Sequence, residues 1–339
     1  MISPAVSVIM SVRNGERYLS EAVDSILNQT FTNFEFIVVD DASDDTTPYV
    51  LDRYNDSRII RLRNETHLGL PSSLNRGLQI AQGVYVARMD ADDVSLPERL
   101  QRQYDTIVAT PDLDVLGTWS RIVTLANRVV CESRPPTTHN MIVWTLLFHN
   151  PLVHPSVMLR SSLLKDSGGY DPNYELSQDY ELWTRLAFKA RFSNLPETLI
   201  TYRRVYRYPS SHKFKAQGKA FETARTKYIS RLLGRDLPLE HTEWLAQSSK
   251  ALMQRDRRTL SFKNCETVIA LLLEAFRAMD ARQMFKTSER GEVHRDLLRR
   301  ITVIGQCSVP FWYWKITALV NEPSTVLKDL YTKLRTRLY

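Results

Sequence analysis

The chain has 339 residues, of which 43% are hydrophobic and 24% are charged. This composition is typical of a packed globular protein, so it excludes wholesale disorder, and the length fits one large domain or two of ordinary size. The formal net charge of +7 is divided unevenly, because residues 1–200 carry an acidic excess and residues 201–339 a basic one. A basic segment can attract nucleic acid, anionic lipid or an acidic ligand, and charge alone does not choose among them.

Strands and helices are predicted to alternate along the first ninety residues. Apolar runs or alternating apolar residues of strand length occur at 6–10, 34–39, 58–62 and 84–89. Between them, apolar residues recur at helical spacing within 19–27, 50–54 and 71–81. This order predicts an α/β fold with a mainly parallel sheet and helices on both faces.

The second part of the chain is predicted to differ in character. A strand is expected from Leu152 to Leu159, a turn at 168–171 and a helix from Gln178 to Ala190. Beyond about residue 205 the sequence is rich in Arg and Lys and reads as helical. We therefore predict a first domain at residues 1–205 and a mostly helical, basic region at residues 206–339.

Acidic residues follow two of the predicted strands, at Asp40-Asp41 and at Asp90-Ala91-Asp92-Asp93. Ligands of open α/β sheets bind beyond the carboxyl ends of the strands, so folding should gather these groups into one cleft. The phosphate-binding patterns GxGxxG and GxxxxGK[ST] are absent from the sequence. A dinucleotide oxidoreductase or a P-loop enzyme is therefore disfavoured.

The segment from Asp90 to Asp93 suggests a site for a divalent cation. Carboxylates two residues apart at a strand end can present oxygen ligands and leave other positions for water and diphosphate oxygens. A cation there would neutralise charge on a departing diphosphate, which predicts a nucleotide-activated donor. Without further context, a solvated acidic turn explains this segment equally well, and a helix-capping turn explains Asp41.

Three cysteines, Cys131, Cys265 and Cys307, lie far apart and lack CxxC spacing. They give no support for a disulfide framework or a cysteine zinc site. The amino terminus reaches strand-like sequence at Val6 with no basic segment and apolar core before it, so we expect no signal peptide and a cytoplasmic protein.

Several ordered motifs resemble the family 2 glycosyltransferases, whose fold is GT-A. The resemblance covers about residues 5–205. The segments that carry it share the family's order along the chain: Val6–Asn14, Ser25–Phe31, Phe36–Ser43, Ala87–Asp93, Asn150–Met158, Gly168–Asp171 and Gln178–Arg185.

The resemblance implies a role for each matching acidic position. Asp41 would contact the nucleobase, Asp90 the ribose, and Asp92 a Mn²⁺ or Mg²⁺ ion, while Asp179 would be the general base. Gln178 stands where the family often has Glu, which removes a charge beside the base.

Two further positions are expected to touch the donor or the metal. Arg13 stands where many members have a Tyr stacked on uracil, and a guanidinium can also stack on a base. His154 can complete the metal shell or contact the diphosphate, although a single His is more often structural. Basic residues near the end of the first domain can also meet phosphate, with a solvated basic loop as the alternative: Arg203, Arg204, Arg207 and His212.

The resemblance implies an inverting transfer by one direct displacement, from a UDP-linked sugar to a hydroxyl of a glycan or lipid-linked acceptor in cell-surface glycan assembly. Asp179 would remove the proton of the acceptor hydroxyl as that oxygen attacks the anomeric carbon. A sugar nucleotidyltransferase is an alternative, but its glycine-rich basic loop is poorly matched by Val12–Glu16. A catalytically silent nucleotide-binding module is another.

The carboxyl-terminal residues suggest contact with a membrane surface. Residues 301–320 carry one charge, Lys315, and an aromatic run at 311–314, and four basic residues follow within 328–337. Polar interruptions argue against a membrane span, and flanking cations suit an anionic cytoplasmic leaflet. A core helix or an oligomer contact is the alternative, and nucleic acid is not expected because no nucleic-acid motif accompanies the charge.

Overall fold

A computed structural model describes residues 3–204, 212–254 and 262–306 of the chain. By their contacts, the residues divide into two units. Unit 1 comprises residues 1–138 and 150–220, and unit 2 comprises residues 139–149 and 221–339. The predicted domain boundary near residue 205 stays a prediction.

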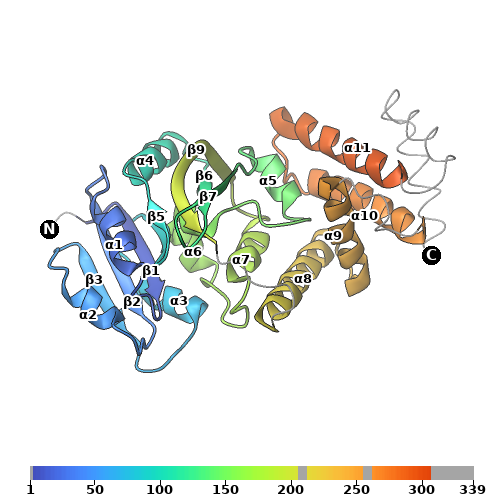
Figure 1. The fold of residues 1–339 in the computed structure, drawn as a ribbon. Helices are drawn as coiled ribbons and strands as arrows, with labels where there is room; N and C mark the ends of the chain where they lie inside the picture. Colours follow the sequence, from blue (N-terminus) through green and yellow to red (C-terminus); the bar gives the residue numbers. More distant parts are fainter. Residues whose placement is uncertain (1–2, 205–211, 255–261, 307–339) are drawn as a thin grey trace. The chain divides into compact units, whose positions relative to one another are not determined.

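Unit 1 contains one mixed sheet of nine strands among the described residues (Figure 1). The strands are β1 (Val6–Val12), β2 (Phe34–Asp40), β3 (Ile59–Arg63), β4 (Tyr85–Asp90), β5 (Val94–Ser95), β6 (Val115–Val123), β7 (Val129–Ser133), β8 (Met158–Arg160) and β9 (Phe192–Arg203). Their order is β3-β2-β1-β4-β8-β6-β9-β5, with β7 paired to β6. Strands β1 to β4 are parallel, whereas β8 runs antiparallel to both β4 and β6.

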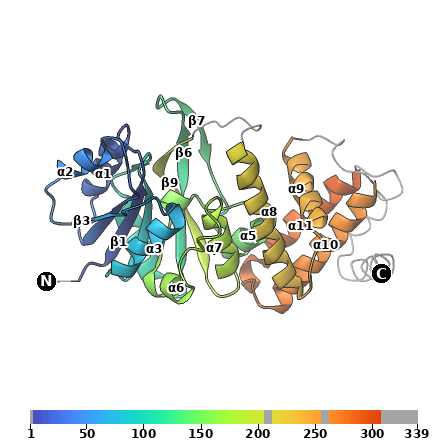
Figure 2. The ribbon, with the colours of Figure 1, turned by 90° about the horizontal axis from the view of Figure 1, so that it is seen from below.

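The helices of this unit are α1 (Leu19–Leu27), α2 (Thr47–Asp52), α3 (Leu70–Ile80), α4 (Arg99–Ala109), α6 (Ser161–Asp166), α7 (Gln178–Leu186) and the first part of α8 (His212–Leu233). Figure 2 shows α1 and α2 on one side of β1 and β3, and α3 on the other. Strands with both faces covered and helices in the connections make up the predicted α/β architecture, which is therefore confirmed.

Alternation along the strands divides the core between the two faces. Val8 and Met10 of β1 pack in the same apolar cluster as Ile26 of α1. Ile9 points to the other face, where a Cβ on Gly77 of α3 would lie only 2.8 Å from the Ile9 Cγ2 atom. The absence of a side chain at Gly77 therefore lets α3 approach the sheet, and the period of two buries both faces of β1.

The predicted strand from Leu152 to Leu159 is wrong over most of its length. Residues His154–Ser156 form a 3₁₀ helix, and only Met158–Arg160 form a strand, β8. Pro155 lies in the first turn of that helix, where its missing N–H is tolerated but where it could not join a sheet ladder. The long strand β9 was not predicted, because Pro196 interrupts its apolar alternation and the pairing with β6 shifts register nearby.

Unit 2 is helical over its described residues. It contains α5 (His139–Thr145), the part of α8 from Phe221, α9 (Leu239–Gln254), α10 (Phe262–Ala281) and α11 (Arg290–Gln306). Trp144 of α5 is fully buried, and its indole N–H donates to Asp296 Oδ2 at 2.8 Å. The segment 139–149 thus belongs to a core formed by residues more than seventy positions later.

A membrane span is not found among the helices of residues 3–204, 212–254 and 262–306. The aromatic run at 311–314, the basic tail and Arg207 lie outside the described residues.

Candidate active site

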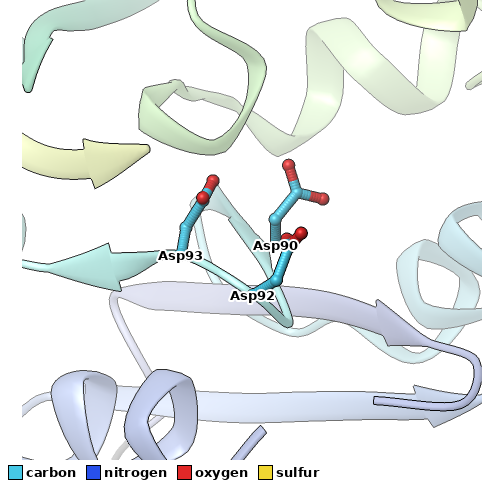
Figure 3. Close-up of side chains that lie close together, drawn as sticks. All are labelled: Asp90, Asp92 and Asp93. Carbon is cyan, nitrogen blue, oxygen red and sulfur yellow. The ribbon is translucent and has the colours of Figure 1, made fainter. Parts of the chain in front are cut away.

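Two strand ends bring the acidic residues to one edge of the sheet. In the parallel register, Val12 pairs with Asp40 and Ser11 pairs with Asp90, so β1, β2 and β4 finish level with one another. Strand β4 ends at Asp90, and the turn that follows carries Asp92 and Asp93. One ligand atom of each of these three carboxylates lies within 4.8 Å of the others (Figure 3).

Burial of this acidic turn is electrostatically costly. Burial, together with the neighbouring Asp90, raises the pKa of Asp92 to about 6. Asp93 is completely buried, and burial with the charges of Asp90 and Asp92 raises its pKa well above the usual value. Asp93 Oδ2 has no hydrogen-bond partner within the described residues. Hard oxygen ligands, crowded together with one of them unpaired, fit a divalent cation such as Mg²⁺ or Mn²⁺.

Two buried arginines hold the acidic turn in place. Arg88 is 2% exposed and donates from Nη2 to Asp90 Oδ1 at 2.5 Å. Arg203, at the end of β9, donates from its backbone N–H to Asp93 Oδ1 at 2.7 Å and from Nη1 to the Asp92 carbonyl oxygen at 2.5 Å. Neither role was predicted from the sequence, where Arg203 was grouped with a basic loop over the donor.

Arg203 also ties the turn to other segments. Its Nη2 donates to Glu21 Oε2 at 2.5 Å, its Nε donates to Asn127 Oδ1 at 3.0 Å, and its guanidinium lies 4.7 Å from the centre of the Tyr18 ring. Because Arg presents five donors in a rigid plane, one side chain can satisfy several acceptors from different segments.

A cavity of about 330 Å³ joins Asp90 to Asp179. Asp179 lies in the first turn of α7, and its Oδ2 accepts a hydrogen bond of 2.7 Å from Asn150 Nδ2. Burial raises the pKa of Asp179, with a further contribution from Asp90, and hydrogen bonds to the carboxylate offset part of that rise. The cavity is lined by Leu70, Asp90, Ser120, Ile122, Ser133, Asn150, Leu152, Val153, His154, Pro155, Ser177, Gln178, Asp179, Tyr202 and Gln217.

Asp41 is occupied by hydrogen bonds from the loop before α3. Its Oδ1 accepts from Asn64 Nδ2 at 2.7 Å and Leu68 N–H at 2.8 Å, and its Oδ2 accepts from Gly69 N–H at 3.0 Å and contacts His67 Nδ1 at 2.7 Å. Burial alone would raise the pKa of Asp41, but these bonds outweigh it and hold the pKa below its usual value. Contact with a nucleobase stays a prediction, and it would require one of these bonds to be exchanged.

The other predicted site residues have different surroundings. Arg13 is exposed at the loop after β1. His154 is buried, its Nε2 is 2.9 Å from the Tyr170 hydroxyl, and burial with the charge of Arg88 holds its pKa well below the usual value. His154 lines the cavity but does not belong to the cluster formed by Asp90, Asp92 and Asp93. Gln178 lines the same cavity.

Comparison with known proteins gives concordant matches. The family model described as glycosyl transferase family 2 matches residues 7–165. The uncharacterized glycosyltransferase MJ1057 of Methanocaldococcus jannaschii is 36% identical over 209 residues, which cover 60% of this chain and 72% of that protein. The O-antigen biosynthesis glycosyltransferase WbnJ of Escherichia coli is 33% identical over 207 residues, covering 58% of this chain and 79% of that protein.

Among solved structures, S. aureus TarS 1–349 in complex with UDP has a similar fold. Its TM-score is 0.54 at 20% identity, and the match covers 94% of this chain and 92% of that one. The same TarS fragment in complex with UDP-GlcNAc gives a TM-score of 0.55 at 22% identity.

Proposed function

The chain belongs to glycosyl transferase family 2, and we propose that it transfers a sugar, with inversion, from a UDP-linked donor to a hydroxyl of a glycan or lipid-linked acceptor. The observation that carries this proposal is the single cavity that both Asp90 and Asp179 line. It combines an acidic turn suited to a cation with a carboxylate suited to remove a proton. The relative in O-antigen biosynthesis supports a role in polysaccharide assembly, and the TarS complexes support UDP as the nucleotide.

Asp90, Asp92 and Asp93 would hold the cation. When bound, Mn²⁺ or Mg²⁺ supplies positive charge that stabilises the departing nucleoside diphosphate. The buried oxygen of Asp93 that has no partner in the described part of the chain supports this assignment. Arg88 and Arg203 would keep the three carboxylates at a fixed spacing while they carry like charge.

Asp179 would act as the general base. An acceptor hydroxyl in the cavity donates its proton to the Asp179 carboxylate as its oxygen attacks the anomeric carbon. The hydrogen bond from Asn150 would orient the carboxylate before the acceptor enters. Because burial raises its pKa, Asp179 is a stronger base than an exposed Asp.

A direct test is UDP release from a panel of UDP-sugars in the presence of Mn²⁺. We expect turnover by the wild type, loss of turnover in Asp92→Ala, and a decrease of about 10² to 10⁴ in Asp179→Asn, the range for a general base. Asp166→Asn changes an exposed carboxylate of α6 and should leave turnover unchanged.

Other outcomes would identify the alternatives. Tight UDP-sugar binding without turnover on any acceptor would indicate a silent binding module. Release of pyrophosphate from UTP and a sugar 1-phosphate would indicate a nucleotidyltransferase. The proposed contacts with a membrane surface or a second copy of the chain depend on residues 301–339, and flotation with anionic liposomes, with and without residues 300–339, tests the former.

A further inference from the structure

The cavity beside Asp179 has a wall made of strands. Ser120 and Ile122 come from β6, Ser133 from β7 and Tyr202 from β9, and all four line the cavity. Ser120 pairs with Ser133, and Ile122 pairs with Tyr202, across neighbouring strands. Paired residues of adjacent strands point to the same face of a sheet, so the two serine hydroxyls lie on the face that borders the cavity.

The Ser120 hydroxyl is unusual in this wall. Ser120 is completely buried, and its Oγ has no hydrogen-bond partner among the residues that the structure describes. A buried hydroxyl without a partner destabilises a fold, because it loses its bonds to water and gains none in return. Other buried serines of the same sheet are paired: Ser7 Oγ donates to Glu35 Oε1 at 2.5 Å and accepts from Gly83 N–H at 2.8 Å.

We propose that Ser120 and Ser133 form a subsite for a sugar hydroxyl, next to the reacting centre between Asp90 and Asp179. This inference rests on the proposed function. A serine hydroxyl has three staggered positions about its Cα–Cβ bond, so rotation brings the Ser120 Oγ from its covered position to the cavity. A sugar hydroxyl can both donate and accept, which makes it a suitable partner for two adjacent serines. The subsite would contribute to sugar selection.

The subsite can bind the donor sugar or the acceptor sugar, and three measurements distinguish them. The probes are UDP, a panel of UDP-glucose, UDP-galactose and UDP-N-acetylglucosamine with Mn²⁺, and methyl glycosides as acceptors. If the donor sugar occupies the subsite, Ser120→Ala weakens binding of the UDP-sugar about tenfold, the typical effect of one hydrogen bond, and leaves UDP binding unchanged. If the acceptor occupies it, only transfer to the glycoside falls.

Stability supplies an independent readout and a matched control. Ser120→Ala removes a hydroxyl without a partner, so its melting temperature should equal or exceed that of the wild type. Ser7→Ala removes a bonded hydroxyl far along the chain from the cavity, so it should melt lower while kcat/KM stays unchanged. Ser133→Ala should reproduce the kinetic effect of Ser120→Ala.

Two results would overturn the subsite. One is a melting temperature that falls in Ser120→Ala as it does in Ser7→Ala, because the hydroxyl would then have a structural partner. The other is wild-type values for UDP-sugar binding, hydrolysis and transfer in both cavity variants. Failure of the wild type to bind or hydrolyse any UDP-sugar would instead contradict the proposed function, and the subsite with it.

Discussion

Four aspartates near one sheet edge have opposite electrostatic surroundings. Asp41 accepts bonds from a whole loop, and its pKa is lowered. Asp92, Asp93 and Asp179 are buried with fewer donors, and the pKa of each is raised. The side chains are chemically identical, so the difference comes from the number of hydrogen-bond donors and the distance to other carboxylates. A stabilised carboxylate suits a structural role, and a destabilised one suits cation binding or proton removal.

The first prediction concerns the pH dependence of catalysis. Asp179 must be deprotonated to act as a base, so kcat/KM should rise with pH through its raised pKa and fall as the pH drops below it. Asn150 donates to the charged form and lowers this pKa. In Asn150→Ala, the acidic limb of the profile should therefore move to higher pH, on the order of one pH unit.

The measurement is kcat/KM against pH at saturating Mn²⁺, with UDP release as the signal. Asn173→Ala, which removes an exposed amide that contacts Asp171, is the control and should leave the profile in place. An acidic limb in Asn150→Ala that stays fixed or moves to lower pH would contradict the assignment.

At the scale of elements, the site depends on how strand ends and helix starts meet. The end of β9 brings Arg203 to the turn after β4, and the start of α7 brings Asp179 to the same cavity. Ser177, immediately before α7, adopts a left-handed backbone with φ 77° and ψ 26°. An L-residue with a Cβ is strained in that region, and such strain is often found beside functional groups.

The second prediction tests that strain. Ser177→Gly should be more stable than Ser177→Ala by about 1 kcal/mol, because glycine adopts positive φ without the clash of a Cβ atom. Both variants lose the same hydroxyl, so the comparison isolates the backbone. Urea unfolding measures the difference. At Asp105, an exposed position within α4, the order should reverse, with alanine more stable than glycine. Equal stability of the two Ser177 variants would show that the turn is unstrained.

At the scale of the whole chain, two units with different chemistry follow one another. Unit 1 carries the acidic cavity, and unit 2 has its own helical core with several buried charged groups. His149 of unit 2 has an Nδ1 atom that is buried and without a partner among the described residues. Burial, together with the charges of Arg300 and Arg225, lowers the pKa of His149 to about 4.

The third prediction is a loss of stability in mild acid. The unfolded chain binds a proton at His149 near pH 6.5, whereas the folded chain resists it until about pH 4. The free energy of unfolding should therefore be unaffected by this group above pH 6.5 and decrease between pH 6.5 and 4, by at most about 3 kcal/mol. His149→Phe removes the titration and should flatten that decrease.

Urea unfolding of the full chain at several pH values between 4 and 7 measures this effect. His241→Phe is the matched control, since that imidazole is only partly covered and should contribute far less. A wild-type slope retained in His149→Phe would contradict the prediction.

The local pattern of the sequence was sufficient to predict β1, β2, β4, the acidic turn and the α/β class, because apolar periodicity and strand-end chemistry depend on neighbouring residues. The family resemblance added Asp92 and Asp179 as expected partners. Tertiary structure alone decided that Arg88, Arg203 and Asn150 hold these carboxylates, and that Ser120 lies unpaired beside them. Burial and hydrogen bonding between residues such as Asp93 and Arg203, 110 positions apart, are set by how strands pair, and no local pattern encodes that pairing.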